Sequence, residues 1–274
     1  MTRSLVIFLV ALAAALGGGV AAAATTQTRD DELRGYVDPT RETELPYRVP
    51  RLGVNAELTR YAPDELRNHL DRMRQAGVTW VRQIVPWDRV EPERGAFSWQ
   101  PWDTIADALR ERPGLRLVAT LVNSPSWARA SNPDSTVTAP PDDPADFARF
   151  AQMFADRYGD VIDHYQIWDE PNLAAAWGMQ EPRPADYVAL LQAGYDAIHG
   201  ADAGATVLAA ALAPTTETGP ANVSDIRYLG DLYALGAASW MDAVAAKPYG
   251  FSAPPADRTV SAETLNLPRS VPPP

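Results

Sequence analysis

Cysteine is absent from this sequence of 274 residues, so disulfide bonds, thiolate metal sites and a cysteine nucleophile are excluded. Positive charge is scarce, because 24 lysine and arginine residues stand against 35 aspartate and glutamate residues, a formal net charge of −11. This balance argues against a polyanionic partner such as nucleic acid. It fits an uncharged ligand, and the eight tryptophans and ten tyrosines suit flat apolar ligands such as sugar rings.

Motifs for metal binding and for a serine nucleophile are also missing. The three histidines, His69, His164 and His199, are scattered, and no pair has the spacing of a metal site. No Gly-x-Ser-x-Gly motif occurs. We therefore expect neither a metal ion nor a cofactor.

Long apolar runs occur only at the N-terminus. A short basic start, an apolar segment and Ala22-Ala23-Ala24 are typical of a secretory signal peptide over residues 1–24. The alternative is an uncleaved membrane anchor, the only case in which we expect membrane contact. Residues 25–50 are acidic and interrupted by prolines, which predicts a linker. The sequence thus predicts an exported protein, secreted or at the cell surface, with one domain over residues 51–274.

Within this domain, segments with strand character alternate with segments of helical periodicity. Helices are predicted between the strands, for example from Pro63 to a stop at Gly77. Strict alternation predicts a parallel sheet with helical crossovers. The predicted strands cover residues 51–55, 79–85, 115–122, 162–168, 206–212 and 241–246.

Two α/β architectures fit this alternation, an open doubly wound sheet and a (β/α)8 TIM barrel. A doubly wound nucleotide-binding sheet would have a glycine-rich first turn, but the first strand runs into Ala56-Glu57-Leu58. Polar and aromatic residues instead follow the C-terminal ends of the strands, where a barrel carries its chemistry. We predict the barrel. It is predicted to be incomplete, because only six strands are found, and an open arc leaves two edges that natural sheets avoid. The chain would then be the first three quarters of a longer domain or a degenerate copy.

Two adjacent carboxylates follow the fourth predicted strand in the segment QIWDEPN, residues 166–172. Such a pair at the end of a buried strand is costly to desolvate. Either this segment is an ordinary exit from the strand, or a carboxyl group is used for chemistry. Because successive side chains of a strand alternate, we expect Asp169 and Glu170 to point to opposite sides and not to act as a pair.

Four segments together resemble the retaining (β/α)8 glycoside hydrolases of the clan that contains families 5 and 39. Residues 167–172 are similar to the W-N-E-P-N signature after strand four. Residues 87–103 resemble the pattern after strand two, and residues 123–128 resemble S-P-x-W-A after strand three. Residues 247–250 read Lys-Pro-Tyr-Gly where relatives usually read His-Pro-Tyr. The resemblance covers residues 52–250, and its motifs occur in the right order.

The resemblance implies hydrolysis of O-glycosidic bonds by two carboxyl groups, one an acid/base and the other a nucleophile. It assigns the general acid/base to Glu170. Arg82 would hold the nucleophile ionised, and Tyr249 would hydrogen-bond it. Trp87 and Trp127 are predicted platforms for sugar stacking. A structural role is the alternative for each of these four, an ion pair for Arg82 and packing for the aromatic residues.

Asn123, Asp169 and Lys247 complete the predicted substrate-binding set. Asp169 replaces the asparagine of relatives, whose amide usually donates a hydrogen bond to the sugar 2-hydroxyl, whereas an ionised carboxylate can only accept one. Lys247 replaces a histidine and adds a long cation. The nucleophile is expected after a seventh strand, which the sequence lacks.

The sequence therefore predicts a retaining glycosidase that acts on a polysaccharide or glycoside. Without its nucleophile, the chain as given is predicted to be inactive. The alternative is a non-catalytic carbohydrate-binding or cell-surface barrel derived from such an enzyme. A carbohydrate is the predicted partner in both cases.

Overall fold

The computed structural model describes residues 52–131 and 136–249. The predicted signal peptide, the linker and the segment after Tyr249 lie outside these residues. The elements follow one another as β1 (Leu52–Asn55), α2 (Pro63–Gln75), β2 (Val78–Pro86), α3 (Trp87–Val90), α4 (Gln100–Arg110), β3 (Arg116–Val122), α5 (Pro144–Tyr158), β4 (His164–Ile167), α6 (Pro184–Ala201), β5 (Thr206–Leu212), α7 (Asp225–Ala234) and β6 (Ala243–Ala246).

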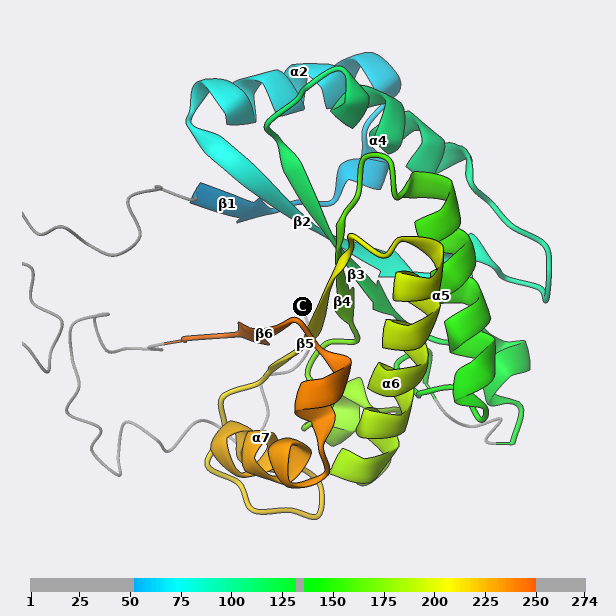
Figure 1. The fold of residues 1–274 in the computed structure, drawn as a ribbon, viewed down its shortest axis with the longest axis vertical. Helices are drawn as coiled ribbons and strands as arrows, with labels where there is room; N and C mark the ends of the chain where they lie inside the picture. The colour runs from blue at the N-terminus through cyan, green and yellow to red at the C-terminus, as the bar shows by residue number, and fades with distance from the viewer. Residues whose placement is uncertain (1–51, 132–135, 250–274) are drawn as a thin grey trace, which may run out of the picture. The chain divides into compact units, whose positions relative to one another are not determined.

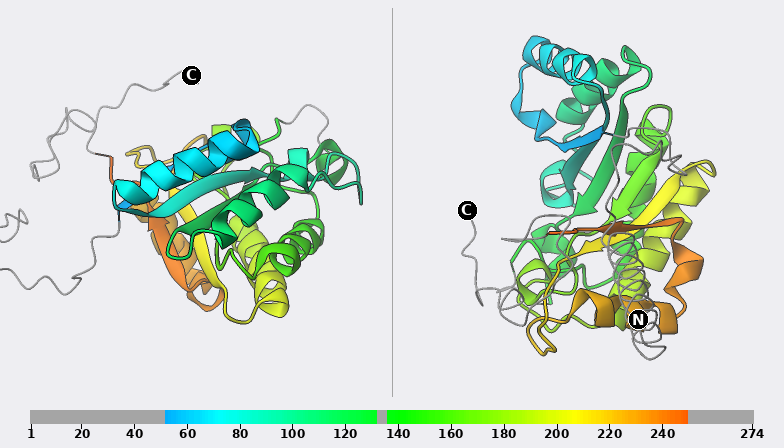
Figure 2. Two further views of the ribbon diagram at one scale, coloured as in Figure 1. Left: turned by 90° about the horizontal axis from the view of Figure 1, so that it is seen from above. Right: turned by 90° about the vertical axis from the view of Figure 1, so that its left-hand side faces the viewer.

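The six strands form one parallel sheet in the order β1-β2-β3-β4-β5-β6. Each strand pairs with its neighbours in sequence, whereas a doubly wound sheet reverses its strand order at a switch point. The sheet curls into a half-barrel with α2, α4, α5 and α6 on its outer side (Figure 1). Figure 2 shows the same curvature from two further directions. The predicted fold class, an incomplete (β/α)8 barrel, is confirmed, because the described residues contain six parallel strands in a half-barrel.

The strand register places the carboxyl ends of neighbouring strands at one edge of the sheet. Pro86 at the end of β2 pairs with Val122 at the end of β3, and Leu121 pairs with Ile167 at the end of β4. Leu212 at the end of β5 pairs with Ala246 at the end of β6. Side chains that follow these strands therefore meet at a common mouth.

Local sequence signals explain where the helices begin. Helices α2, α5 and α6 each start on a proline, because the first N–H groups of a helix have no partner within it. Asp143 caps α5 by accepting a hydrogen bond from the backbone N–H of Ala145 at 2.9 Å. Within the described residues, no helix is long and apolar enough to cross a bilayer.

An aromatic stripe on α5 forms the centre of the core between helices and sheet. Phe147, Phe150, Phe154 and Tyr158 recur at helical spacing, and all four are buried. Burial of each such side chain contributes roughly 1.5–3 kcal/mol relative to exposure. The stripe holds α5 against the strands.

Helix α6 packs closely behind β4 because Gly194 has no side chain. A Cβ atom at this position would lie 2.9 Å from Cδ1 of Ile167 and 3.1 Å from the ring of Phe147. Ile167 is the last residue of β4, two positions before Asp169. The glycine therefore supports the strand from which the acidic residues emerge.

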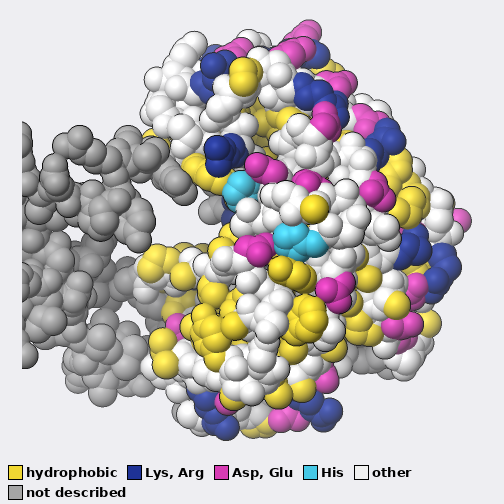
Figure 3. Space-filling view, in the orientation of Figure 1, with side chains coloured by type: hydrophobic (Ala, Val, Ile, Leu, Met, Phe, Trp, Pro, Cys, Tyr) yellow, Lys and Arg dark blue, Asp and Glu magenta, His cyan; other side chains and the backbone are white. Residues whose placement is uncertain are grey.

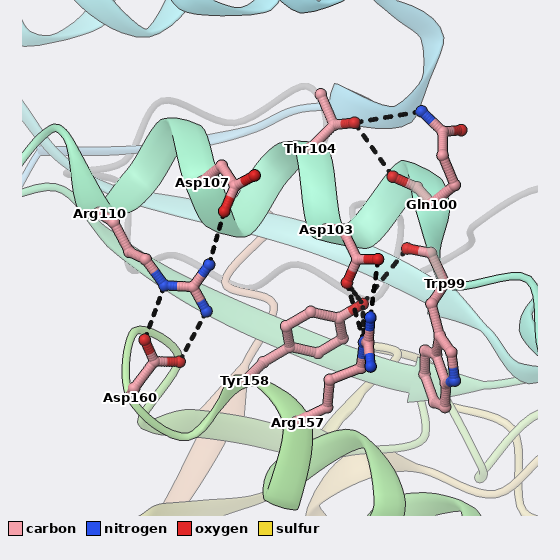
Figure 4. Close-up of polar contacts among 9 residues, drawn as sticks. All are labelled: Trp99, Gln100, Asp103, Thr104, Asp107, Arg110, Arg157, Tyr158 and Asp160. Atoms are coloured by element: carbon pink, nitrogen blue, oxygen red, sulfur yellow. Dashed lines mark hydrogen bonds and ion pairs between the residues drawn. The ribbon is translucent and has the colours of Figure 1, made fainter.

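Charged side chains of both signs are interspersed over the face that Figure 3 shows. Several form ion pairs between consecutive helical units, as the close-up in Figure 4 shows. Arg157 of α5 binds Asp103 of α4 through two hydrogen bonds of 2.8 Å. Arg110 at the end of α4 binds Asp160, which precedes β4, at 2.7 and 2.9 Å. These pairs lie largely in water, so each contributes little to stability.

Candidate active site

The chain leaves strand geometry abruptly at the end of β4. Trp168 and Glu170 have φ angles of 67° and 52°, a left-handed conformation that residues other than glycine seldom adopt. Such conformations cost on the order of 1–3 kcal/mol and persist where the surrounding structure holds them. Strand alternation, which was expected to run through Trp168, therefore ends one residue earlier.

This turn brings both carboxylates of the pair to the same cation. The Nζ atom of Lys247 lies 2.9 Å from Oδ2 of Asp169 and 2.6 Å from Oε1 of Glu170. The two oxygens are therefore no more than about 5.5 Å apart. The prediction that Asp169 and Glu170 point to opposite sides is wrong, because it assumed an extended backbone at positions where the chain turns left-handed.

Arg82 of β2 binds the carboxylate oxygen of Asp169 that does not contact Lys247. Its Nη2 atom lies 3.0 Å from Oδ1 of Asp169, and its Nε donates to Oε1 of Gln166 at 3.2 Å. The amide nitrogen of Gln166 donates to the carbonyl of Trp168 at 2.7 Å and to Oδ1 of Asp169 at 3.2 Å. Gln166 is buried and was not among the predicted site residues. An amide side chain between Tyr165 and Ile167, directly before the end of the strand, was the sequence signal that could have revealed it.

Positive and negative groups thus alternate across the mouth in the order Arg82, Asp169, Lys247 and Glu170. Burial opposes the charge on Lys247, but the charge of Asp169 and the hydrogen bond to Glu170 outweigh this effect and raise the pKa of Lys247 above its ordinary value. Lys247 is therefore a cation at neutral pH. Each of these four side chains is only partly exposed, between 15% and 27%.

The loop that carries Glu170 is tied to the end of β5. The backbone N–H of Glu170 donates to the carbonyl of Ala211 at 3.0 Å. Asn172 is buried and bonds Ala213 through both ends of its amide, as donor at 2.8 Å and as acceptor at 2.9 Å. Its nitrogen also reaches the carbonyl of Val223 at 2.9 Å. The last residue of the QIWDEPN segment therefore anchors the loop, a role that sequence reasoning did not assign.

Trp87 occupies a different place from the one predicted. Its side chain is completely buried, stacks on Phe150 at 5.3 Å and donates from Nε1 to Oε2 of Glu91 at 2.8 Å. No face of the ring remains for a sugar, so the prediction of a stacking platform is corrected to a core residue. The packing of α5 against the end of β2 is the physical reason.

The other predicted binding residues lie on neighbouring loops. Trp127 is half-buried, meets the edge of Trp87 and has the guanidinium of Arg94 4.4 Å from its ring centroid. Asn123 follows β3 with a φ of 63°, and Tyr249 is 57% exposed. The hydrogen bonds and ion pairs described for Glu170 do not include Asn123 or Trp127. Their contact with a substrate stays a prediction.

Buried Glu91 organises the loop after β2 and was missed as an individual residue. Its carboxylate accepts hydrogen bonds from Trp87, from the backbone of Gly95 at 2.7 Å and from Arg149 of α5 at 2.5 Å. Gly95 has a φ of 81°, which glycine adopts without strain. Glu91 thus links the loop to α5, while its backbone carbonyl accepts from Trp127 at 3.2 Å.

Comparison with known proteins relates this fold to glycoside hydrolases. Residues 59–161 match the model of glycoside hydrolase family 42, described as beta-galactosidase. No curated protein matches the chain.

Similar solved structures include a family 39 β-xylosidase from Caulobacter crescentus, with 19% identity and a TM-score of 0.54 over 75% of this chain and 48% of that one. A β-galactosidase from Marinomonas ef1 has 15% identity and a TM-score of 0.53, over 73% and 41% of the two chains. A family 39 glycoside hydrolase from Bacteroides cellulosilyticus has 18% identity and a TM-score of 0.52, over 73% and 38%. The chain thus spans less than half the length of these structures.

Proposed function

We propose a function from one premise: the chain is a relative of the family 42 and family 39 glycoside hydrolases, with six parallel βα units of their barrel in its described residues. Its substrate is then a carbohydrate. The reaction is hydrolysis of an O-glycosidic bond with retention of configuration, and Glu170 is the general acid/base. The supporting observation is the position of Glu170 at the mouth, on a left-handed turn directly after β4.

The two oxygens of Glu170 have different surroundings. Oε1 accepts a hydrogen bond from Lys247, whereas Oε2 has no partner among the described residues. The side chain is 27% exposed, so Oε2 is accessible to a ligand in the mouth. A general acid needs this combination of a held carboxyl group and one oxygen that can meet the leaving group.

The reaction proceeds in two steps. In the first, Oε2 of Glu170 gives a proton to the glycosidic oxygen as the bond to the anomeric carbon breaks and the nucleophile attacks that carbon. In the second, Oε2 takes a proton from a water molecule whose oxygen replaces the nucleophile.

We assign the nucleophile to a residue outside those described. Asp169 is unsuited to that role because its oxygens are bound by Arg82, Gln166 and Lys247. It also follows the same strand as Glu170, whereas two carboxyl groups must flank the scissile bond.

The proposed role of Glu170 is tested with aryl glycosides of several sugars and the full-length gene product, which supplies the nucleophile. Replacement of Glu170 by glutamine should lower the rate by about 10²–10⁴-fold, since this removes the transferable proton. Glu181→Gln is the matched control, because Glu181 lies in the same β4–α6 connection with a side chain that is 55% exposed. It should leave the rate unchanged. Equal rates for wild type and Glu170→Gln would reject the assignment.

A carbohydrate-binding barrel without catalysis is the second candidate. The contact that favours it is the short ion pair between Lys247 and Glu170, which stabilises the carboxylate rather than the acid. Calorimetric titration with oligosaccharides, together with the aryl glycoside assay, separates the candidates. Binding without turnover by the wild type would support this second function.

A further inference from the structure

Lys247 is the only lysine in the chain, and the other 23 basic residues are arginines. The two side chains differ in geometry, because a lysine ammonium is a compact charge with three rotatable donors, whereas a guanidinium is a rigid planar fork. The single ammonium lies at the mouth of the half-barrel, with its side chain 15% exposed. The single lysine of the sequence therefore lies at the proposed active site.

The ammonium is the only basic group bound to Glu170 among the described residues. Arg82 contacts Asp169 and Gln166, and no contact joins it to Glu170. Lys247 contacts both carboxylates, each within hydrogen-bonding distance. Two carboxylates this close would repel each other if both were ionised without a cation between them. Lys247 therefore places a cation between the carboxyl groups of Asp169 and Glu170.

We propose that Lys247 is a positioning residue for Glu170: it binds Oε1, holds the carboxyl group in place and leaves Oε2 as the oxygen that carries the transferable proton. This inference rests on the proposed role of Glu170 as general acid/base. Asp169 takes part by holding the ammonium from its other side at 2.9 Å. Its aspartate identity, which departs from the asparagine of relatives, then has a function, because a neutral amide would not match the charge of Lys247.

The role of Lys247 differs between the two steps but requires no proton from it. When Glu170 has given its proton to the leaving oxygen, the new carboxylate faces the ammonium, which stabilises the negative charge. When Oε2 takes a proton from the attacking water, the Oε1 contact keeps the carboxyl group in the same orientation. Lys247 stays protonated throughout, in agreement with the raised pKa of its ammonium.

The single lysine allows a direct spectroscopic test of the contact. In the full chain labelled with 13C at lysine Cε, one lysine signal reports on Lys247, and its chemical shift follows the charge of the ammonium. In the wild type the midpoint of its titration should lie above the ordinary lysine value of about 10.4. It should fall in Glu170→Gln and in Asp169→Asn, since each removes one of the two anions.

Arg110→Met serves as the matched control. Arg110 also binds two carboxylates, Asp107 at 2.7 Å and Asp160 at 2.7 and 2.9 Å (Figure 4). Asp160 precedes β4, whereas Glu170 follows it, so this pair lies at the opposite end of the strand. The control should leave the Lys247 titration unchanged. An identical titration in wild type and Glu170→Gln would overturn the inference.

The positioning role itself is tested by leaving-group dependence. Proton donation matters more for 4-nitrophenol, the poorer of two leaving groups, than for 2,4-dinitrophenol. Lys247→Met should therefore lower kcat/KM, which reports the step in which the phenol leaves, at least tenfold more for 4-nitrophenyl glycosides than for 2,4-dinitrophenyl glycosides. An equal loss for both would show a merely structural role and contradict the proposal.

Failure of the inference can be told apart from failure of the proposed function. If the wild type and Glu170→Gln hydrolyse glycosides at equal rates, the general acid/base role of Glu170 is rejected, and the positioning role falls with it. If glycosides are hydrolysed but the midpoint of the Lys247 titration is the same in the wild type and in Glu170→Gln, only the inference about Lys247 is rejected.

Discussion

Arg82 of β2 and Asp169, which follows β4, form an ion pair of 3.0 Å across the mouth of the half-barrel. The guanidinium was predicted to hold a nucleophile ionised, and in the described structure its charge is matched by Asp169. Asp169 in turn binds Lys247, so one aspartate connects β2 with the residues that follow β4 and β6. Its negative charge is therefore central to the arrangement.

Asp169→Asn should lower the free energy of unfolding by about 1–3 kcal/mol, because it leaves Arg82 and Lys247 partly buried without this counter-charge. Urea denaturation followed by fluorescence measures the change. Asp64→Asn is the control, since Asp64 is fully exposed and pairs with Arg67 only at 3.4 Å. The control should change stability by less than about 0.5 kcal/mol. Equal effects of the two substitutions would show that the ion pairs of Asp169 with Arg82 and Lys247 do not stabilise the protein.

The charge of Lys247 should make stability depend on alkaline pH. Its pKa is raised in the folded state, so the folded protein holds this proton more tightly than the unfolded chain does. The contribution is therefore fully present below the unfolded pKa of about 10.4 and is lost as pH rises through the folded pKa.

Urea denaturation of wild type and Lys247→Met between pH 7 and 11.5 measures this contribution. Any excess in the free energy of unfolding of the wild type over Lys247→Met that comes from this ion pair should stay constant up to about pH 10 and then shrink. The comparison removes the effect of other groups that titrate in the same range. If the stability difference between the wild type and Lys247→Met grows at alkaline pH, the predicted contribution of the Lys247 charge is wrong.

Gly194→Val should destabilise the protein by about 1–3 kcal/mol more than Gly200→Val. Both glycines lie in α6, so the change in helix propensity from glycine to valine has the same sign at both positions. A Cβ atom at Gly194 would press on Ile167 at 2.9 Å, whereas nothing lies within 4 Å of a Cβ atom at Gly200. Thermal denaturation of the two variants measures the difference. Equal melting temperatures would show that α6 can move away from β4 without cost.

Glu91→Ala should cost about 2–4 kcal/mol, because it removes the buried partner of Arg149 and leaves the indole N–H of Trp87 without its acceptor. Glu93→Ala, on the exposed part of the same loop, is the control. Denaturation in urea at pH 7 measures both. If Glu91→Ala unfolds at the same urea concentration as the control, the buried carboxylate does not hold the loop.

Most of the fold could be predicted from the sequence, because its signals are local. The helix predicted from Pro63 to a stop at Gly77 is α2, Pro63–Gln75. Alternation of strands with helices predicted the parallel sheet. The exceptions were short. No pattern indicated α3, β4 covers His164–Ile167 rather than 162–168, and β6 begins at Ala243 rather than at 241.

The amino-acid sequence by itself determined which residue types stand at the strand ends, and thus the relationship to glycoside hydrolases and the importance of Glu170 as a candidate. Only the tertiary structure decided which of these side chains meet. Lys247 reaches Glu170 across 77 positions of sequence, and packing of α5 buries Trp87 away from the mouth. Local periodicity reports on backbone conformation, but contacts between distant strand ends depend on how the sheet curves, and no short pattern encodes that curvature.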